Sequence, residues 1–261
     1  MTPPATTQSD SKTKRSRPQQ VADAIKADIV AEHLGPGDRL PSEPELIERH
    51  GMAKGTIREA VRLLEAQGLV KTRTGPGGGA FVNAPSDGRT QALLSNYFYF
   101  KNLSVSDIYT LRRQLEPELA ASLAGTLSDQ QLSALEAHLD ATAHPSMDAQ
   151  SERQQHVASL AFHRTLAGFS DNALLGFVVG FLANVLTELT VNKQLYEPRN
   201  DELRRRGHEY QVTLLDALRD GKSSEARDIM AAHMVMAERA MKDQEIIMTR
   251  RFMAEEGSLH D

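Results

Sequence analysis

The sequence predicts a mainly α-helical protein with an N-terminal winged helix-turn-helix followed by an all-α antiparallel helical bundle. Three helix-like segments precede residue 68, and two short strand-like runs then flank a glycine-rich turn. After Pro85 only helical periodicity is found, in segments separated by short polar breaks. Charge supports the same division, because basic residues cluster between Arg49 and Arg73 and acidic residues dominate from Asp87 onward.

Length and composition are those of an ordinary globular chain. At 261 residues there is room for two modest domains, and the hydrophobic share of 40% and charged share of 25% are typical. The chain has no cysteine, which excludes disulfides, thiolate zinc sites and cysteine nucleophiles. We therefore expect a cytoplasmic protein.

Five segments are expected along the chain. They are a disordered N-terminal arm (1–17), the winged helix-turn-helix (18–86), a linker helix (87–104), a helical domain (105–247) and a C-terminal tail (248–261). The arm has no apolar core of the kind that a secretory signal needs. The apolar run Ala173–Leu186 is shorter than the roughly 20 residues of a membrane span. We expect it to form a buried helix and expect no membrane partner.

The N-terminal elements follow from local signals. Apolar residues at helical spacing predict a helix over Val21–Ala31. Ser42 with Glu45 forms an S-x-x-E capping box that starts a second helix reaching about Arg49. A third helix is expected over Thr56–Gln67, and a strand, a glycine turn and a second strand at Ala80–Val82 complete the winged motif.

The sequence after Pro85 predicts seven helices. Ser128 and Ser170 are candidate N-caps and Gly221 is a candidate helix stop. Helices are predicted near 88–101, 105–124, 128–143, 149–169, 171–196, 200–220 and 223–247. Such a series with short connections predicts an antiparallel bundle.

The third helix and the wing carry the residues expected to contact DNA. In a helix-turn-helix the third helix presents polar side chains to the major groove. Arg58 is the best candidate for a base contact, because a guanidinium bridges two acceptors of guanine. The complete predicted set is Lys54, Thr56, Arg58, Arg62, Lys71, Arg73, Gly77 and Gly78. For each cation taken alone, a solvated surface charge is the alternative interpretation.

The N-terminal segment "GDRLPSEPELIERHGMAKGTIREAVRLLEAQGLVKTRTGPGGGAFV" resembles the head of the GntR family of bacterial transcriptional regulators. The resemblance rests on "PGDRLPSE", "IREAVRLLEAQGLV" and the glycine-rich wing, in that order. It implies a head that binds operator DNA as a dimer. Pro44 and Ala53-Lys54 depart from the family pattern, and Ala53 lacks the oxygen that would cap the third helix.

The later segments "DIYTLRRQLEPELAASLA", "FHRTLAGFSDN" and "GHEYQVTLLDALRDGKSSEARDIMAAHM" resemble the FCD effector domain of the FadR branch of GntR regulators. Many such domains hold a divalent metal through one aspartate and three histidines. The resemblance places the histidines at His163, His208 and His233, and it places Ser159 at the aspartate position. It therefore implies a transition metal such as zinc or nickel, in a site weakened by the neutral Ser159. The alternatives are histidines packed in the core, or histidines that bind the effector directly.

Arg112 in "LRRQLE" matches the arginine that meets an effector carboxylate in this family, and Tyr109 is a weaker candidate for the pocket wall. A surface ion pair of Arg112 with Glu116 is the alternative.

Together these features predict a homodimeric, ligand-responsive regulator, a repressor, that binds an inverted-repeat operator. Its effector would be a small carboxylate or a fatty-acid-like molecule. Two alternatives stay open: a constitutive DNA-binding protein whose helical domain only dimerises, and a three-histidine metal enzyme.

Overall fold

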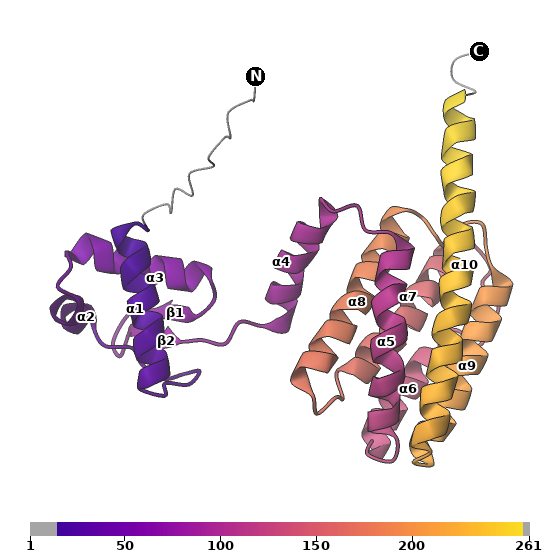
Figure 1. Cartoon of the computed structure of the whole chain (residues 1–261), viewed down its shortest axis with the longest axis horizontal. Helices are drawn as coiled ribbons and strands as arrows, with labels where there is room; N and C mark the ends of the chain where they lie inside the picture. Colours follow the sequence, from indigo (N-terminus) through magenta and orange to yellow (C-terminus); the bar gives the residue numbers. More distant parts are fainter. Residues whose placement is uncertain (1–14, 258–261) are drawn as a thin grey trace, which may run out of the picture. The chain divides into compact units, whose positions relative to one another are not determined.

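A computed structural model describes residues 15–257, with side-chain positions through residue 248. The chain divides between residues 90 and 91 into two compact units (Figure 1). Most of the expected arm, 1–17, lies outside the described residues. Arg17 does not belong to an arm but is the first residue of a helix, because Ser16 caps it and Pro18 is tolerated in its first turn.

The first unit is a three-helix domain with a two-stranded wing. Its elements are α1 (Arg17–Ala31), α2 (Glu43–His50), α3 (Lys54–Ala66), β1 (Val70–Arg73) and β2 (Gly79–Val82). One apolar cluster joins all five, formed by Val21, Ala22, Ile25, Leu40, Leu46, Ile57, Ala60, Leu64, Val70 and Val82.

The helix ends in this unit follow the predicted capping chemistry. Glu45 accepts a hydrogen bond from the backbone N–H of Ser42 at 2.6 Å, which completes the capping box of α2. Gly51 ends α2 with a φ of 61°. Ala53 gives α3 no side-chain cap, as its methyl group predicts.

The wing is a tight antiparallel hairpin in which Val70 pairs with Val82 and Arg73 pairs with Gly79. Only glycine fits at residue 78, because a Cβ there would lie 2.5 Å from the carbonyl oxygen of Arg73. Arg39 donates from Nη2 to the carbonyl oxygen of Gly78 at 2.8 Å and so fixes the tip of the wing.

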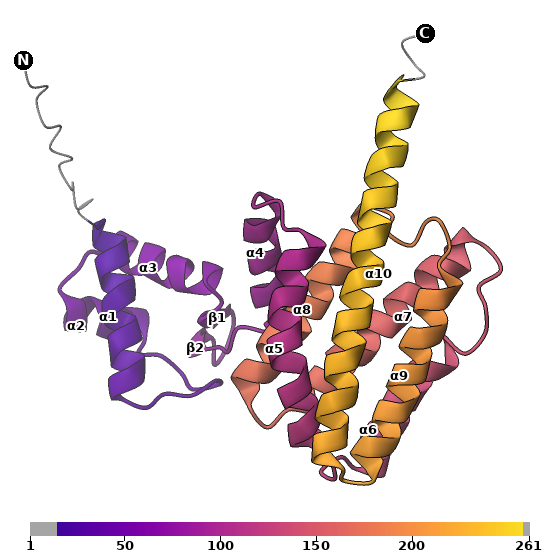
Figure 2. The ribbon, with the colours of Figure 1, turned by 45° about the vertical axis from the view of Figure 1, so that its right-hand side comes forward.

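The second unit is the predicted helical bundle. Helix α4 (Asp87–Tyr99) begins just before the boundary between the units and continues into the second one. The helices that follow are α5 (Val105–Leu123), α6 (Asp129–Asp140), α7 (Ala149–Ala167), α8 (Ala173–Asn192), α9 (Asp201–Arg219) and α10 (Ser223–Gly257). Within the bundle α5 packs between α8 and α10, while α7 packs on α8 and α9 on α10 (Figures 1 and 2). The predicted end of the last helix near 247 was too early, since neither glycine nor proline occurs between that point and Gly257.

Helix α8 is apolar around most of its circumference. An 18-residue window within its 20 residues has a mean hydropathy of 1.9, so by length and composition the helix could cross a membrane. Among the described residues it is the one helix that passes this test, and 44% of the tested window is buried inside the unit. Its buried side chains, including Val179, Leu182 and Leu186, belong to the bundle core. The helix is longer than the apolar run recognised in the sequence, and it packs in the core as expected.

Two glycine turns meet at one end of the bundle. Gly125 follows α5 and Gly221 follows α9, with φ values of +75° and +71°. A Cβ on Gly125 would lie 3.1 Å from the Cα of Gly221. The backbones therefore approach more closely than side chains at these positions would permit.

Candidate DNA-binding and effector sites

The N-terminal half of α3 presents an exposed cationic surface. Lys54 and Arg58 are both solvent-exposed, and both face Glu43 of α2. The Glu43 carboxylate lies 2.7 Å from Nε of Arg58 and 3.3 Å from Nζ of Lys54. The hydrogen bond from Arg58 is the largest influence on the pKa of Glu43. Together with the weaker hydrogen bond from Lys54 it outweighs the opposing effect of burial, so this pKa is lowered. Glu43 thus stays ionised and holds two predicted DNA-contacting side chains in one place.

The other predicted DNA-contacting residues are less uniform. Arg62 is exposed and lies 3.7 Å from Glu59, whereas Thr56 is half-buried. In the wing Lys71 is exposed, and the guanidinium of Arg73 lies over the Phe81 ring at 4.6 Å. Gly77 has a φ of 75° and, with Gly78, forms the turn between these strands.

Two arginines of the head have structural partners that the sequence did not indicate. Arg49 reaches back to α1, at 2.5 Å from Glu32 and 3.4 Å from Asp28, so it ties α2 to α1. Arg39, whose backbone forms a bridge with Phe81, supports the wing.

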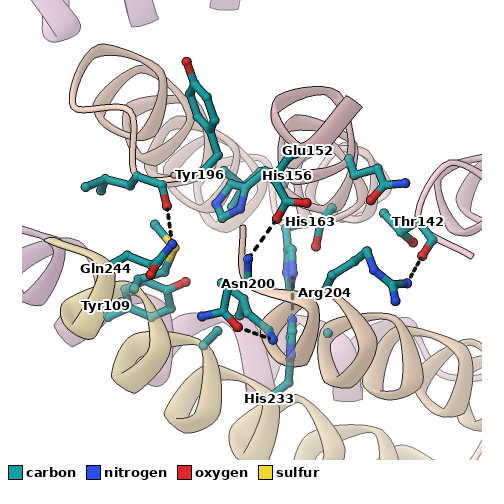
Figure 3. A pocket seen from close by; sticks show the side chains of 18 of the residues that line it. Tyr109, Thr142, Glu152, His156, His163, Tyr196, Asn200, Arg204, His233 and Gln244 are labelled. Carbon is teal, nitrogen blue, oxygen red and sulfur yellow. Dashed lines mark hydrogen bonds between the residues drawn. The ribbon is translucent and has the colours of Figure 1, made fainter. Parts of the chain in front are cut away.

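The second unit encloses a cavity of about 50 Å³. Side chains of α5, α7, α9 and α10 line it, together with residues of the α8–α9 connection (Figure 3). Since a water needs roughly 10–15 Å³ by this measure, the cavity holds a few waters or a small ligand. Tyr109 and Arg112, both predicted for the pocket wall, line it and are buried.

A fully buried ion network begins at Arg112. Its Nε donates to Glu116 one turn later, and the second oxygen of Glu116 lies 2.5 Å from Nδ1 of His163. Both Arg112 and Glu116 are 1% exposed, so the surface ion pair weighed for Arg112 is instead a core ion pair. Burial raises the pKa of Glu116, but the charges of Arg112 and His163 outweigh it and lower that pKa to about 2.

His163 and His233 meet at the cavity. Their Nε2 atoms are 3.2 Å apart and their rings are nearly parallel, with centroids 5.1 Å apart (Figure 3). Burial, followed by the neighbouring His163 and Arg112, lowers the pKa of His233 well below its usual value. His233 is therefore neutral near pH 7.

The third partner of this pair is Gln211 and not His208. The Gln211 amide nitrogen lies 3.4 Å from Nε2 of His163, and it donates to the carbonyl oxygen and hydroxyl of Ser159 at 3.0 and 3.2 Å. His208 instead pairs through Nδ1 with the hydroxyl of Thr142 at 3.0 Å, and it does not line the cavity.

Helix geometry explains this difference from the sequence-based placement. The buried face of α9 carries Gly207, Gln211, Leu214, Leu215 and Leu218, which recur at helical spacing. His208 follows Gly207 and is rotated off this face. Gln211 could have been found by extending the leucine pattern back by one turn.

The donor atoms present do not fit the three-histidine metal site implied by the family resemblance. Within the described part of the chain, no group of three His, Cys, Asp or Glu residues converges as a metal site would require. Ser159 and Gln211 offer a neutral hydroxyl and an amide, which are poor ligands for zinc or nickel.

Other pocket residues were missed or underestimated from the sequence. His156 lines the cavity, and burial, then the charge of Arg112, lowers its pKa to about 4. Arg204 donates to the carbonyl oxygen of Thr142 at 2.9 Å, and Glu152 accepts from the hydroxyl of Ser146. Each lies on the pocket-facing side of its helix (Figure 3).

A winged helix-turn-helix joined to a helical domain with an internal polar pocket defines the class of DNA-binding transcriptional regulators that carry their own ligand domain. Family comparison agrees: residues 17–82 match the bacterial regulatory proteins of the gntR family, and residues 107–236 match the FCD domain. The chain belongs to the GntR family, with an FCD domain of the FadR-like type. It is a regulator and not an enzyme.

Named relatives are also transcriptional regulators. The chain is 26% identical to LutR of Bacillus subtilis over 78% of its own length and 92% of that protein. It is also 26% identical to a putative L-lactate dehydrogenase operon regulatory protein of Escherichia coli, over 85% of each. A stronger match, 48% to Rv0792c of Mycobacterium tuberculosis, covers 25% of this chain and 24% of that regulator. Among solved structures, a GntR protein of Streptococcus agalactiae shares the fold, with a TM-score of 0.59 at 23% identity over 85% of this chain and 99% of the other.

Proposed function

We propose that this chain is a cytoplasmic, homodimeric repressor that loses operator affinity when a small carboxylate binds its FCD domain. The observation that carries the effector proposal is Arg112. This side chain is buried and lines the cavity, and its Nη2 has no hydrogen-bond partner in the protein. A carboxylate would complete its bidentate geometry.

The size and polarity of the cavity favour a short effector over a fatty-acid-like one. A volume of about 50 Å³ leaves no room for a long acyl chain. Polar groups of Arg204, His233 and Asn200 surround it. The name of the Escherichia coli relative concerns an L-lactate dehydrogenase operon, so L-lactate and other short carboxylates are the first compounds to test.

For the head, we propose that α3 enters the major groove, with Arg58 reading a base edge and Lys54 and Thr56 beside it. Arg62 and the wing residues Lys71 and Arg73 would contact phosphates, where Gly77 and Gly78 allow close approach of the backbone. Two heads in a dimer would read an inverted repeat, as two-fold symmetry requires.

Reciprocal coupling provides the test. An operator selected from random DNA with the full-length protein is titrated, with and without short carboxylates, by fluorescence anisotropy. A true effector should weaken operator binding, and bound operator should weaken effector binding by the same factor. Arg204→Gln should reduce effector binding, while the exposed Arg205→Gln serves as the matched control.

The alternative function, a constitutive DNA-binding protein, predicts a different result. If no short carboxylate changes either the thermal stability or the operator affinity, the FCD domain does not sense this class of compound. The FCD domain would then serve dimerisation alone, and gel filtration would still show a dimer.

A further inference from the structure

The connection between α8 and α9, residues 193–200, forms one wall of the cavity in the second unit. Leu195, Tyr196 and Asn200 line the cavity from this segment (Figure 3). The other lining residues belong to helices, with one exception in the α6–α7 connection. We propose that residues 193–200 are the gate of the cavity, the segment that opens to admit a solute, and that Gln244 of α10 holds it closed. The proposal concerns entry to the cavity, so it goes beyond the proposed effector and does not depend on the chemistry of that compound.

A single buried side chain anchors the gate. Leu195 is 1% exposed and belongs to the bundle core, whereas the other residues of the segment are half-buried or exposed. Gln194, directly before it, has a φ of 51°, so the chain turns sharply as it leaves α8. A segment with so little buried apolar surface opens at a lower free-energy cost than a helix packed along its length. The gate is therefore the part of the wall that opens most easily.

Gln244 provides buried hydrogen bonds that keep the gate in place. Its side chain is 3% exposed and lines the cavity. The amide nitrogen donates to the carbonyl oxygen of Pro198 at 2.7 Å and to that of Leu195 at 3.4 Å. Because neither carbonyl lies in a helix or strand, the amide takes the place of a backbone partner, and in an open form water would do so. Loss of the amide should therefore favour the open form.

The other hydrogen bonds of the gate are weaker restraints. Arg199 is exposed, and its Nη1 donates to the carbonyl oxygen of Ser146 at 2.7 Å. The backbone N–H of Asn200 makes only a long bond, 3.4 Å, to the carboxylate of Glu152. Water competes for exposed donors, so contacts of this kind contribute little to closure. The buried amide of Gln244 is the contact that decides it.

The α6–α7 connection is the alternative route into the cavity, and its contacts disfavour it. Thr142, its one lining residue, pairs through its hydroxyl with Nδ1 of His208 at 3.0 Å, and its carbonyl oxygen accepts from Arg204 at 2.9 Å. Thr142 is therefore fixed through both side chain and backbone. Gln155 of α7 also lines the cavity, and its amide donates to a main-chain carbonyl of this connection at 2.8 Å. Gln155 thus corresponds to Gln244 at the other connection and is its matched control.

A cysteine placed inside the cavity measures how often the gate opens. The chain has no cysteine of its own, so Ala237→Cys introduces a single thiol at a buried position on the cavity wall. Its reaction with methyl methanethiosulfonate, a small neutral reagent, is followed by mass spectrometry of the intact protein. The rate should stay nearly constant as urea is raised below the unfolding transition, because a local opening exposes little surface. A rate that rises steeply with urea would mean entry through unfolding and would overturn the proposal.

Two glutamine variants in the Ala237→Cys background then identify the segment that opens. Gln244→Met keeps the length of the side chain and removes the amide, so it should raise the reaction rate about tenfold, as loss of one or two hydrogen bonds implies. Gln155→Met makes the same change at the other connection and should alter the rate less than about twofold. Rates are compared where urea unfolding shows each variant to be folded. Equal rates in the two variants, or a larger rise with Gln155→Met, would overturn the assignment of the gate.

Discussion

The carboxylate of Glu43 on α2 lies 2.7 Å from Nε of Arg58 on α3, and the same carboxylate holds Lys54 at 3.3 Å. An acidic residue thus stands within the surface proposed to contact DNA. It limits attraction to arbitrary phosphate backbones, and it restricts the directions in which Arg58 can point.

Glu43→Gln should therefore increase affinity for unrelated DNA and decrease discrimination. Loss of one exposed ion pair has a small effect, so each change should be about two- to fivefold. Anisotropy with selected and scrambled duplexes measures both quantities. Glu48→Gln is the matched control, because it removes the same charge from α2 at a residue with no ion pair among the described side chains. An equal increase in affinity for both duplexes would contradict the inference that Glu43 orients Arg58.

Arg112→Met should destabilise the bundle by about 3–5 kcal/mol, because it leaves the Glu116 carboxylate buried without its cation. The double variant Arg112→Met with Glu116→Gln should recover part of this loss. Urea unfolding of each variant measures the effect. Arg113→Met is the control: Arg113 is partly exposed and its partner Glu238 keeps Lys242, so a loss below about 1 kcal/mol is expected. Similar losses of unfolding free energy in the two variants would contradict the larger contribution expected from the buried ion pair.

His156 should make the unfolding free energy depend on pH. Its folded pKa of about 4 lies below the value of an unfolded histidine, roughly 6.5, because burial and then Arg112 oppose its charge. The unfolded chain therefore binds the proton first, and this contribution is complete above about pH 6.5 and lost as the pH falls toward 4. Urea unfolding from pH 8 to 5 should show a shallower decline for His156→Gln than for the wild type. If the unfolding free energies of the two proteins changed with pH in parallel from pH 8 to 5, His156 would not be the source of the pH dependence.

Gly125→Ala should lower the stability of the bundle. Alanine in a left-handed backbone conformation costs roughly 1–2 kcal/mol, and its Cβ would press on the turn at Gly221. Gly88→Ala, at a position with open space and no positive φ, should leave stability unchanged or slightly higher. Denaturant midpoints distinguish the two, and equal effects would mean that the two turns separate easily.

Periodicity and capping signals in the sequence predicted each helix of the described chain, because these depend on near neighbours such as Ser42 with Glu45. The pocket was harder. His208 was selected for the chemistry of imidazole, whereas helical register decides which side chain reaches His163, and Gln211 holds that position. Glu116 was recognised only as a possible surface partner. Its bridging role depends on His163, which lies 47 residues further along the chain.

The apolar character of α8 has a consequence for handling the protein. When the bundle opens, a 20-residue segment with the hydropathy of a membrane span loses the cover of α5 and α7. Heated chains should then associate through this segment faster than they refold, so a melting scan would report a rate of loss instead of an equilibrium. Refolding from urea at low protein concentration avoids this competition. The rate at which the protein is lost to aggregation is therefore set by how often α8 becomes exposed.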